Sequence, residues 1–223
     1  MIHALVPVKR LAAAKSRLLP LLGPDGVRAL TLAMLTDVVA ALRAAPEIGA
    51  VGVVTEDEEV ARAAHEAGAE AIVLADRGLN PSLETAGARL ARDDEALLVV
   101  LGDVAGLTPD DVAALCDALR ALGGRGVVLA PANDGGSAAL LRAPRQVIPA
   151  RFGAASAAAH RALAVEGGVP YREVHRPGLL LDLDCEDDVR AFLARGDGGA
   201  RTRAALAALL AAPRASSQAR RTS

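Results

Sequence analysis

Short apolar runs alternate with longer segments of helical period along this chain, and this alternation constrains its fold more than any other feature. We predict strands at residues 2–8, 50–54, 71–74, 96–101, 127–130, 138–141 and 179–183. Apolar residues at three- and four-residue steps predict an amphipathic helix over about residues 25–45. Continuous apolar strands between helices favour a mostly parallel sheet covered on both faces, an α/β three-layer sandwich.

Acid-rich segments mark where further helices begin. They are Glu56–Glu59, Thr108–Asp111 and Glu186–Asp188, and negative charge suits a helix N-terminus. Thr108 is the clearest N-cap, because Pro109 follows it at the first helical position.

The composition indicates one domain. More than half of the 223 residues are hydrophobic, enough for one sizeable core over residues 1–212. Within it, residues 135–178 are interrupted by glycine and proline and are expected to form a flap or hairpin region over the site. Residues 213–223 have no apolar period and are expected to be a disordered tail.

Charge and hydropathy exclude several classes of partner. A formal net charge of −2 and the near absence of aromatic residues argue against nucleic acid. No apolar run approaches the ~20 residues that span a bilayer, and the N-terminus lacks a secretory signal. Cys116 and Cys185 lie far apart and are expected to be free thiols. We expect a cytoplasmic protein that acts on small molecules.

Three aspartates predict a metal site. Asp182 and Asp184 follow an apolar run, and residues two apart on a strand share one face. Asp103 ends the run at 96–102, although a lone aspartate there can be a turn former. Three converging acids would repel one another and raise their pKa values unless a cation is bound. Oxygen ligands of this kind suit magnesium and therefore phosphate chemistry.

A basic loop follows the first predicted strand. Four cations lie within nine residues there, namely Lys9, Arg10, Lys15 and Arg17. They can wrap a triphosphate, or they can form an ordinary solvated surface loop. No Gly-x-x-x-x-Gly-Lys-Ser/Thr motif is present, so the chain is not a P-loop NTPase.

Two glycine-containing turns can present backbone amides to an anion. One is Asn133–Ser137, and the other enters a helix at Phe152–His160. Ser156 either holds an anion through its hydroxyl or caps the helix. His160, one turn further on, either supports the anion or packs in the core.

These segments together resemble the 2-phospho-L-lactate guanylyltransferase (CofC/FbiD) family. The resemblance rests on ordered motifs at Pro7–Lys9, Ala14–Leu18, Gly78–Asn80, Gly102–Asp103, Asp134–Ser137, Phe152–His160 and Leu181–Asp187. It implies a nucleotide-diphospho-sugar transferase fold, which is glycosyltransferase-A-like and Rossmann-like. It further implies transfer of GMP from GTP to a three-carbon phosphoacid for the deazaflavin coenzyme F-420, with the product passed to the next pathway enzyme. The phosphoacid is phosphoenolpyruvate in actinobacterial members, with 2-phospho-L-lactate and 3-phosphoglycerate as alternatives.

The resemblance also implies a role for individual residues. Two magnesium ions would be bound by Asp103, Asp182 and Asp184. The phosphoacid would be bound by Ser137, Gly153 and Ser156. The nucleotide would be bound by Pro7, Val8, Lys9, Lys15, Arg17, Asn80, Ser82 and Asp103. Of these, the residues with a catalytic role would be Asp103, Lys9, Lys15 and Arg17.

Two departures from the family pattern leave rival functions open. Ala138 stands where the family has Asn, and Ala105 where it has Pro. One rival is another nucleotidyltransferase of this fold, acting on a sugar phosphate or a molybdenum-cofactor precursor. The other is a catalytically idle nucleotide-binding protein. The oligomeric state is also open, because apolar helix stripes can cover either the sheet or a second copy in a homodimer.

Overall fold

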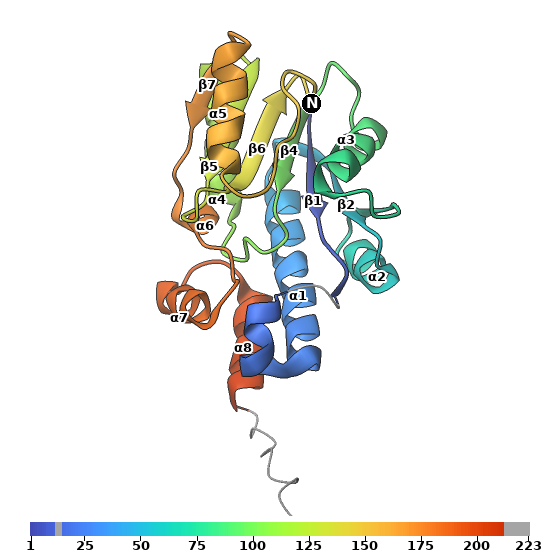
Figure 1. The fold of residues 1–223 in the computed structure, drawn as a ribbon, viewed down its shortest axis with the longest axis vertical. Coiled ribbons are helices and arrows are strands. Elements are labelled where there is room, and N and C mark those ends of the chain that lie inside the picture. The colour runs from blue at the N-terminus through green and yellow to red at the C-terminus, as the bar shows by residue number, and fades with distance from the viewer. Residues whose placement is uncertain (12–14, 212–223) are drawn as a thin grey trace, which may run out of the picture.

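The computed structural model describes residues 1–11 and 15–211. Its centre is a seven-stranded sheet in the order β3-β2-β1-β4-β6-β5-β7 (Figure 1). The strands are β1 (Ile2–Pro7), β2 (Ile48–Thr55), β3 (Glu70–Val73), β4 (Ala96–Val100), β5 (Gly126–Pro131), β6 (Ser137–Ala143) and β7 (Tyr171–Glu173). Neighbours are parallel except that β6 runs antiparallel to β4 and β5. The predicted mostly parallel sheet is therefore confirmed.

Helices cover both faces of the sheet. They are η2 (Ser16–Leu18), α1 (Leu19–Ala44), α2 (Glu58–Glu66), α3 (Leu79–Leu90), α4 (Pro109–Ala121), α5 (Ser156–Glu166), α6 (Pro177–Leu180), α7 (Glu186–Arg195) and α8 (Ala200–Ala211). Residues of α1, α2 and α4 pack in the core on one face, and residues of α3 and α5 pack on the other (Figure 1). The molecule is a three-layer α/β sandwich.

The strands divide their side chains between the two faces by simple alternation. In β1, Ala4 and Val6 join one core while Leu5 joins the other. All three are fully buried. Because successive side chains point to opposite faces, a strand buried on both sides needs an uninterrupted apolar sequence. This explains why the strands appear as continuous apolar runs.

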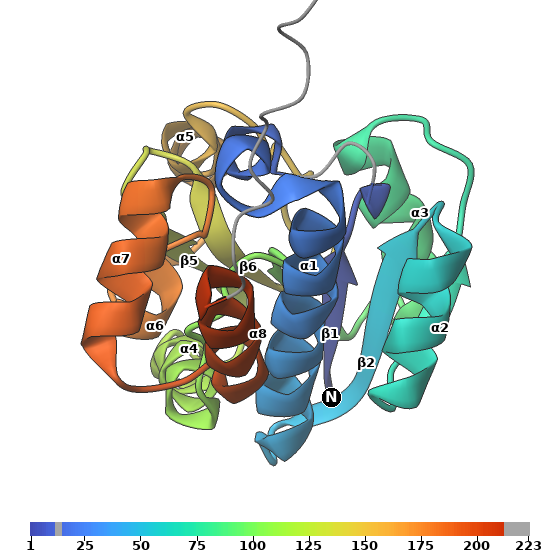
Figure 2. The ribbon, with the colours of Figure 1, turned by 90° about the horizontal axis from the view of Figure 1, so that it is seen from below.

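A third apolar cluster lies beyond one end of the sheet. The first turns of α1 gather there with α7 and α8, as Figure 2 shows from below. Leu30 of α1, Phe192 of α7 and Leu206 of α8 are buried together in it. The C-terminal helices are thus anchored on the N-terminal helix.

The predicted helix starts agree with the structure. Asp57 caps α2, and Thr108 forms a capping box with Asp111 at the start of α4. Helix α1 begins at Leu19, earlier than the expected 25, but Gly23 interrupts it with a φ of 68°. The regular part therefore begins close to the predicted position.

The strand predicted at residues 179–183 is wrong. Pro177–Leu180 form the short helix α6, and Leu181–Asp184 follow without regular structure. The apolar run arises instead from burial in two places, because Leu179 packs in the core under the sheet and Leu183 packs in the third cluster. Proline at the first helical position also favours a helical turn at that point.

The segment 135–178, expected to be a flap or hairpin region, supplies β6 and β7 to the sheet and α5 to one face. Strand β7 was not predicted, because its three residues are too few to show a period. The expected tail at 213–223 lies outside the described residues. Among the helices of the described ranges, none is long and apolar enough to cross a membrane.

Candidate active site

The strand order creates a crevice at one edge of the sheet. From β1 the chain builds β2 and β3 on one side, whereas β4 pairs with the other side of β1. Ligands of open α/β sheets bind at such a switch point, outside the carboxyl ends of the strands. Because β6 is antiparallel to β4, it begins at this same edge. Lys9, Asp103 and Ser137 are therefore brought to one side of the molecule.

Gly102 lets the loop after β4 approach the loop after β1. A Cβ atom at this position would lie 2.9 Å from Cγ2 of Val8 and 3.2 Å from the carbonyl oxygen of Pro7. The adjacent Leu101 donates its backbone N–H to the carbonyl of Ala138, at 3.0 Å. Asp103 is thus held between the first loop and the start of β6.

The three predicted metal ligands converge. One carboxylate oxygen from each of Asp103, Asp182 and Asp184 lies within 4.8 Å of the others. The last two belong to the irregular segment between α6 and α7, whose end is fixed because Asp188 accepts hydrogen bonds from the backbone of Asp184 and Cys185 at 3.0 and 2.8 Å. The convergence holds although the strand that suggested it does not exist.

Lys15 brings positive charge into this cluster. Its Nζ lies 2.5 Å from Oδ2 of Asp103 and also contacts Oδ1 of Asp184. Burial opposes the charged ammonium, but the two carboxylates outweigh it and raise the pKa of Lys15 above its ordinary value. The backbone of Lys15 is left-handed, with a φ of 49°. Strained backbone of this kind is concentrated at functional sites.

One ammonium group leaves the carboxylate cluster incompletely neutralised. Among the described residues, Oδ1 of Asp103 is buried without a hydrogen-bond partner. Burial, followed by the negative charges of Asp103 and Asp184, raises the pKa of Asp182 to about 6. An oxygen-only donor set with an unpartnered buried oxygen fits a hard divalent cation.

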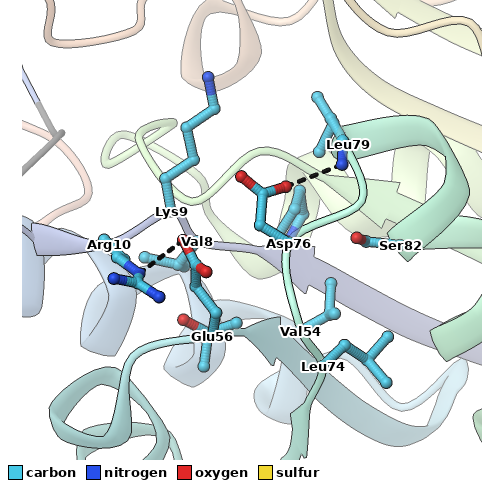
Figure 3. Close-up of a pocket in the computed structure, with 12 residues that line it drawn as sticks. Val8, Lys9, Arg10, Val54, Glu56, Leu74, Asp76, Leu79 and Ser82 are labelled. Carbon is cyan, nitrogen blue, oxygen red and sulfur yellow. Dashed lines mark hydrogen bonds and ion pairs between the residues drawn. The ribbon is translucent and has the colours of Figure 1, made fainter.

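A cavity of about 380 Å³ opens beside the first loop (Figure 3). Its wall is partly apolar, from Pro7, Val8, Val54, Leu74 and Leu79, and partly polar, from Lys9, Arg10, Thr55, Glu56, Asp76 and Ser82. Arg10 pairs with Glu56 at 2.8 Å, and Asp76 accepts a hydrogen bond from the backbone of Gly78 at 2.7 Å. In Figure 3, Lys9 extends away from the Arg10–Glu56 pair. The size and the mixed wall suit a small ligand.

Sequence reasoning missed several residues of this wall, among them Glu56, Leu74 and Asp76. Leu74 and Asp76 come just after β3 ends, at the edge where Lys9 follows β1. The signal that could have found them is this shared position at carboxyl strand ends.

Four residues expected to bind the nucleotide lie outside the cavity wall, and two of them, Lys15 and Asp103, belong to the carboxylate cluster. The side-chain amide of Asn80 exchanges two hydrogen bonds with the backbone of Phe152, at 3.0 and 2.8 Å. It thereby ties α3 to the loop before α5. Arg17 is exposed on η2, two residues beyond Lys15.

Of the three residues expected to bind the phosphoacid, the two serines are buried and Gly153 is exposed. Oγ of Ser137 lies 3.0 Å from Oγ of Ser156, and these residues are 2% and 1% exposed. Gly153, with a φ of 139°, precedes Ser156 in the turn that enters α5. His160 contacts Ser137 from the next turn of the helix. The structure thus brings the two serines together beside the loop that carries Gly153.

A comparison with known families shows which family this chain belongs to. The family model described as "Guanylyl transferase CofC like" matches residues 2–222. The chain belongs to this family. A relative named phosphoenolpyruvate guanylyltransferase from Sphaerobacter thermophilus is 41% identical, over 88% of this chain and 95% of the relative. A protein of the same name from Nocardia farcinica is 36% identical, over 92% and 90%.

Solved structures agree on the fold of this family member. A candidate nucleotide-diphospho-sugar transferase from Desulfovibrio desulfuricans matches with a TM-score of 0.75 and 16% identity, over 94% of this chain and 96% of the other. A nucleotidyl transferase from Methanothermobacter matches at 0.61 with 20% identity, over 86% and 95%. The predicted nucleotide-diphospho-sugar transferase fold is therefore confirmed.

Proposed function

We propose that this protein transfers GMP from GTP to phosphoenolpyruvate, with release of pyrophosphate, in the synthesis of coenzyme F-420. The observation that carries the proposal is the convergence of Asp103, Asp182 and Asp184 around Lys15 beside a cavity of nucleotide size. Relatives named phosphoenolpyruvate guanylyltransferase indicate the substrates.

In this reaction, the protein would position the two reactants and neutralise their negative charge. A phosphate monoester is largely ionised at neutral pH, so its oxygen can attack the α-phosphorus of GTP without a protein base. Two magnesium ions, held by Asp103, Asp182 and Asp184, would supply the positive charge that lets two anions approach. The protein would contribute by holding the reactants in line at the sheet edge.

The side chains around the crevice would bind the nucleoside, neutralise the pyrophosphate and orient the carboxylates. The cavity that contains Val8 and Ser82 would hold the nucleoside. Lys9 and Arg17, both exposed, would meet the negative charge that develops on pyrophosphate. Lys15 would orient the carboxylates of Asp103 and Asp184.

The phosphoacid would lie at Ser137, Gly153 and Ser156, where the start of β6 meets the turn into α5. Asn80 supports this place indirectly, because its hydrogen bonds to Phe152 fix the same turn. 2-Phospho-L-lactate and 3-phosphoglycerate carry the same two anionic groups and are the alternative acceptors. We further propose that the protein is cytoplasmic and passes its product to the next deazaflavin pathway enzyme.

Asp103→Asn tests the proposal, because it removes one charge and keeps the shape. We expect pyrophosphate release from GTP, magnesium and phosphoenolpyruvate to fall about a thousandfold, as for loss of a metal-organising charge. Asp94→Asn, an exposed residue on the far loop before β4, is the matched control and should keep full activity. Unchanged thermal unfolding of Asp103→Asn would show that the fold is intact. Full activity of the Asp103→Asn variant would refute the assignment.

The same assay separates the rival functions. Release with a sugar phosphate but with no three-carbon phosphoacid would indicate another nucleotidyltransferase of this fold. GTP binding without release for any acceptor would indicate a catalytically idle protein, the function that Ala105 and Ala138 left open. Both alanines are buried, at 1% and 2% exposure.

A further inference from the structure

His160 is a buried titratable residue that the proposed chemistry does not use. Its ring is 0% exposed and lies edge-on to Phe152, with the centroids 5.2 Å apart. Nδ1 is 2.9 Å from Oγ of Ser137, and Nε2 is 2.9 Å from the backbone nitrogen of Arg151. Both ring nitrogens are therefore engaged, each on a different part of the expected phosphoacid site.

The partner of Nε2 determines which nitrogen carries the hydrogen. The backbone N–H of Arg151 can only donate, so Nε2 must accept. Burial, followed by the positive charges of Arg142 and Arg151, lowers the pKa of His160 to about 4, so the ring is neutral at pH 7. A neutral ring that accepts at Nε2 carries its hydrogen at Nδ1. Nδ1 therefore donates to Ser137.

This assignment leaves the serine pair with one hydrogen too many. Ser137 accepts from His160, and one hydroxyl hydrogen joins Ser137 to Ser156. In either direction of that bond, one hydroxyl hydrogen remains, and the described residues provide no further acceptor for it. A buried donor without an acceptor is costly, so the pair is prepared for an acceptor from outside the protein.

We infer that His160 is a positioning residue. Its Nδ1–H donates to Oγ of Ser137, and one hydroxyl hydrogen of the serine pair is thereby left to donate to an anionic oxygen of the phosphoacid. The inference rests on the proposed function, because it assumes that the acceptor is the carboxylate or phosphate of that substrate. It assigns His160 no contact with GTP.

Two substitutions separate the two ring nitrogens. In His160→Asn, an amide N–H takes the place of Nδ1 and can still donate to Ser137. In His160→Gln, the amide reaches the place of Nε2 and can still accept from Arg151, but the donor to Ser137 is lost. Exposed His65→Gln is the matched control for the second change.

Steady-state kinetics on the full chain provide the test, with pyrophosphate release as the readout. We expect His160→Gln to raise the KM for phosphoenolpyruvate about tenfold with the KM for GTP unchanged, and His160→Asn to stay near the wild-type value. A role confined to tethering the loop predicts the reverse order, which would overturn the inference, as would equal changes in both KM values.

A second measurement keeps the inference testable if one variant is unstable. In a Ser137→Ala background, replacing His160 by Gln should not raise the KM for phosphoenolpyruvate further, because the bond is already lost. Full additivity of the two changes would contradict the inference. An inactive wild-type protein would contradict the proposed function itself, whereas an active wild type with a silent His160→Gln variant would contradict only the role of His160.

Discussion

At the scale of single residues, the site contains a strained backbone conformation and closely spaced like charges. Lys15 adopts a left-handed backbone that costs about 1 kcal/mol or more, and its ammonium is held by Asp103 and Asp184. Asp182 is half-buried next to two like charges. The left-handed backbone of Lys15 and the like charges around Asp182 both lower the stability of the free protein. Such features are expected where a cluster binds a cation, because function and stability compete at such sites.

Asp182→Asn is expected to stabilise the metal-free protein at pH 7. The folded pKa of about 6 exceeds that of an unfolded aspartate, so the folded state binds more protons between about pH 4 and 6 and stability falls as the pH rises through this window. The stability of the variant should not fall in this window, and its gain in stability over the wild type should vanish near pH 4. Thermal unfolding with a chelator at both pH values measures the effect, with Asp94→Asn as control. An equal shift at both pH values would show that charge is not the cause.

At the scale of elements, local end signals largely determined where the helices lie. The Thr108 hydroxyl accepts from the backbone of Asp111, and the Asp111 carboxylate accepts from the backbone of Thr108 at 3.0 Å. Asp111 also accepts from Arg176 at 2.9 Å, which ties the start of α4 to α6. One capping box thus fixes both a helix start and the segment that leads to Asp182.

Thr108→Ala is expected to lower the free energy of unfolding by about 1 kcal/mol, the usual value of an N-cap. Thr108→Ser keeps the accepting oxygen and should lose much less. Urea unfolding of the two variants provides the comparison. Equal losses would indicate that packing of the threonine methyl, and not the hydrogen bond, stabilises this end of α4.

At the scale of the whole molecule, contacts between distant segments close the fold. Asp37 of α1 accepts three hydrogen bonds from the first turn of α8, one from Arg201 at 3.1 Å and two from Thr202 at 2.7 Å. Helix α8 is therefore capped by a residue more than 160 positions earlier in the chain. This contact joins α8, the last helix of the described chain, to α1, and Figure 2 shows the two helices side by side.

Asp37→Ala should destabilise the protein by about 2 kcal/mol, because it leaves the amides of α8 without their acceptors. Asp25→Ala, an exposed change on the same helix, is the control and should have little effect. Hydrogen exchange would locate the loss, since the amides of α8 should exchange faster than those of β1 and β4. Uniform faster exchange across the sheet would argue against a local role of this cap.

Three kinds of sequence signal were sufficient to predict the sandwich, six of its strands and the three converging aspartates. These signals are the apolar period, the helix caps and the acids at strand ends, and each acts within a few residues or follows from strand direction alone. They failed at residues 179–183, where an apolar run is buried in two separate clusters, and at β7, which is too short to show a period. Local patterns report that a residue is buried but not against what. The remaining features depend on residues far apart in the chain, so only the folded arrangement could specify them. They are the strand order, the antiparallel insertion of β6, the place of Lys15 between two carboxylates and the hydrogen bond from His160 to Ser137.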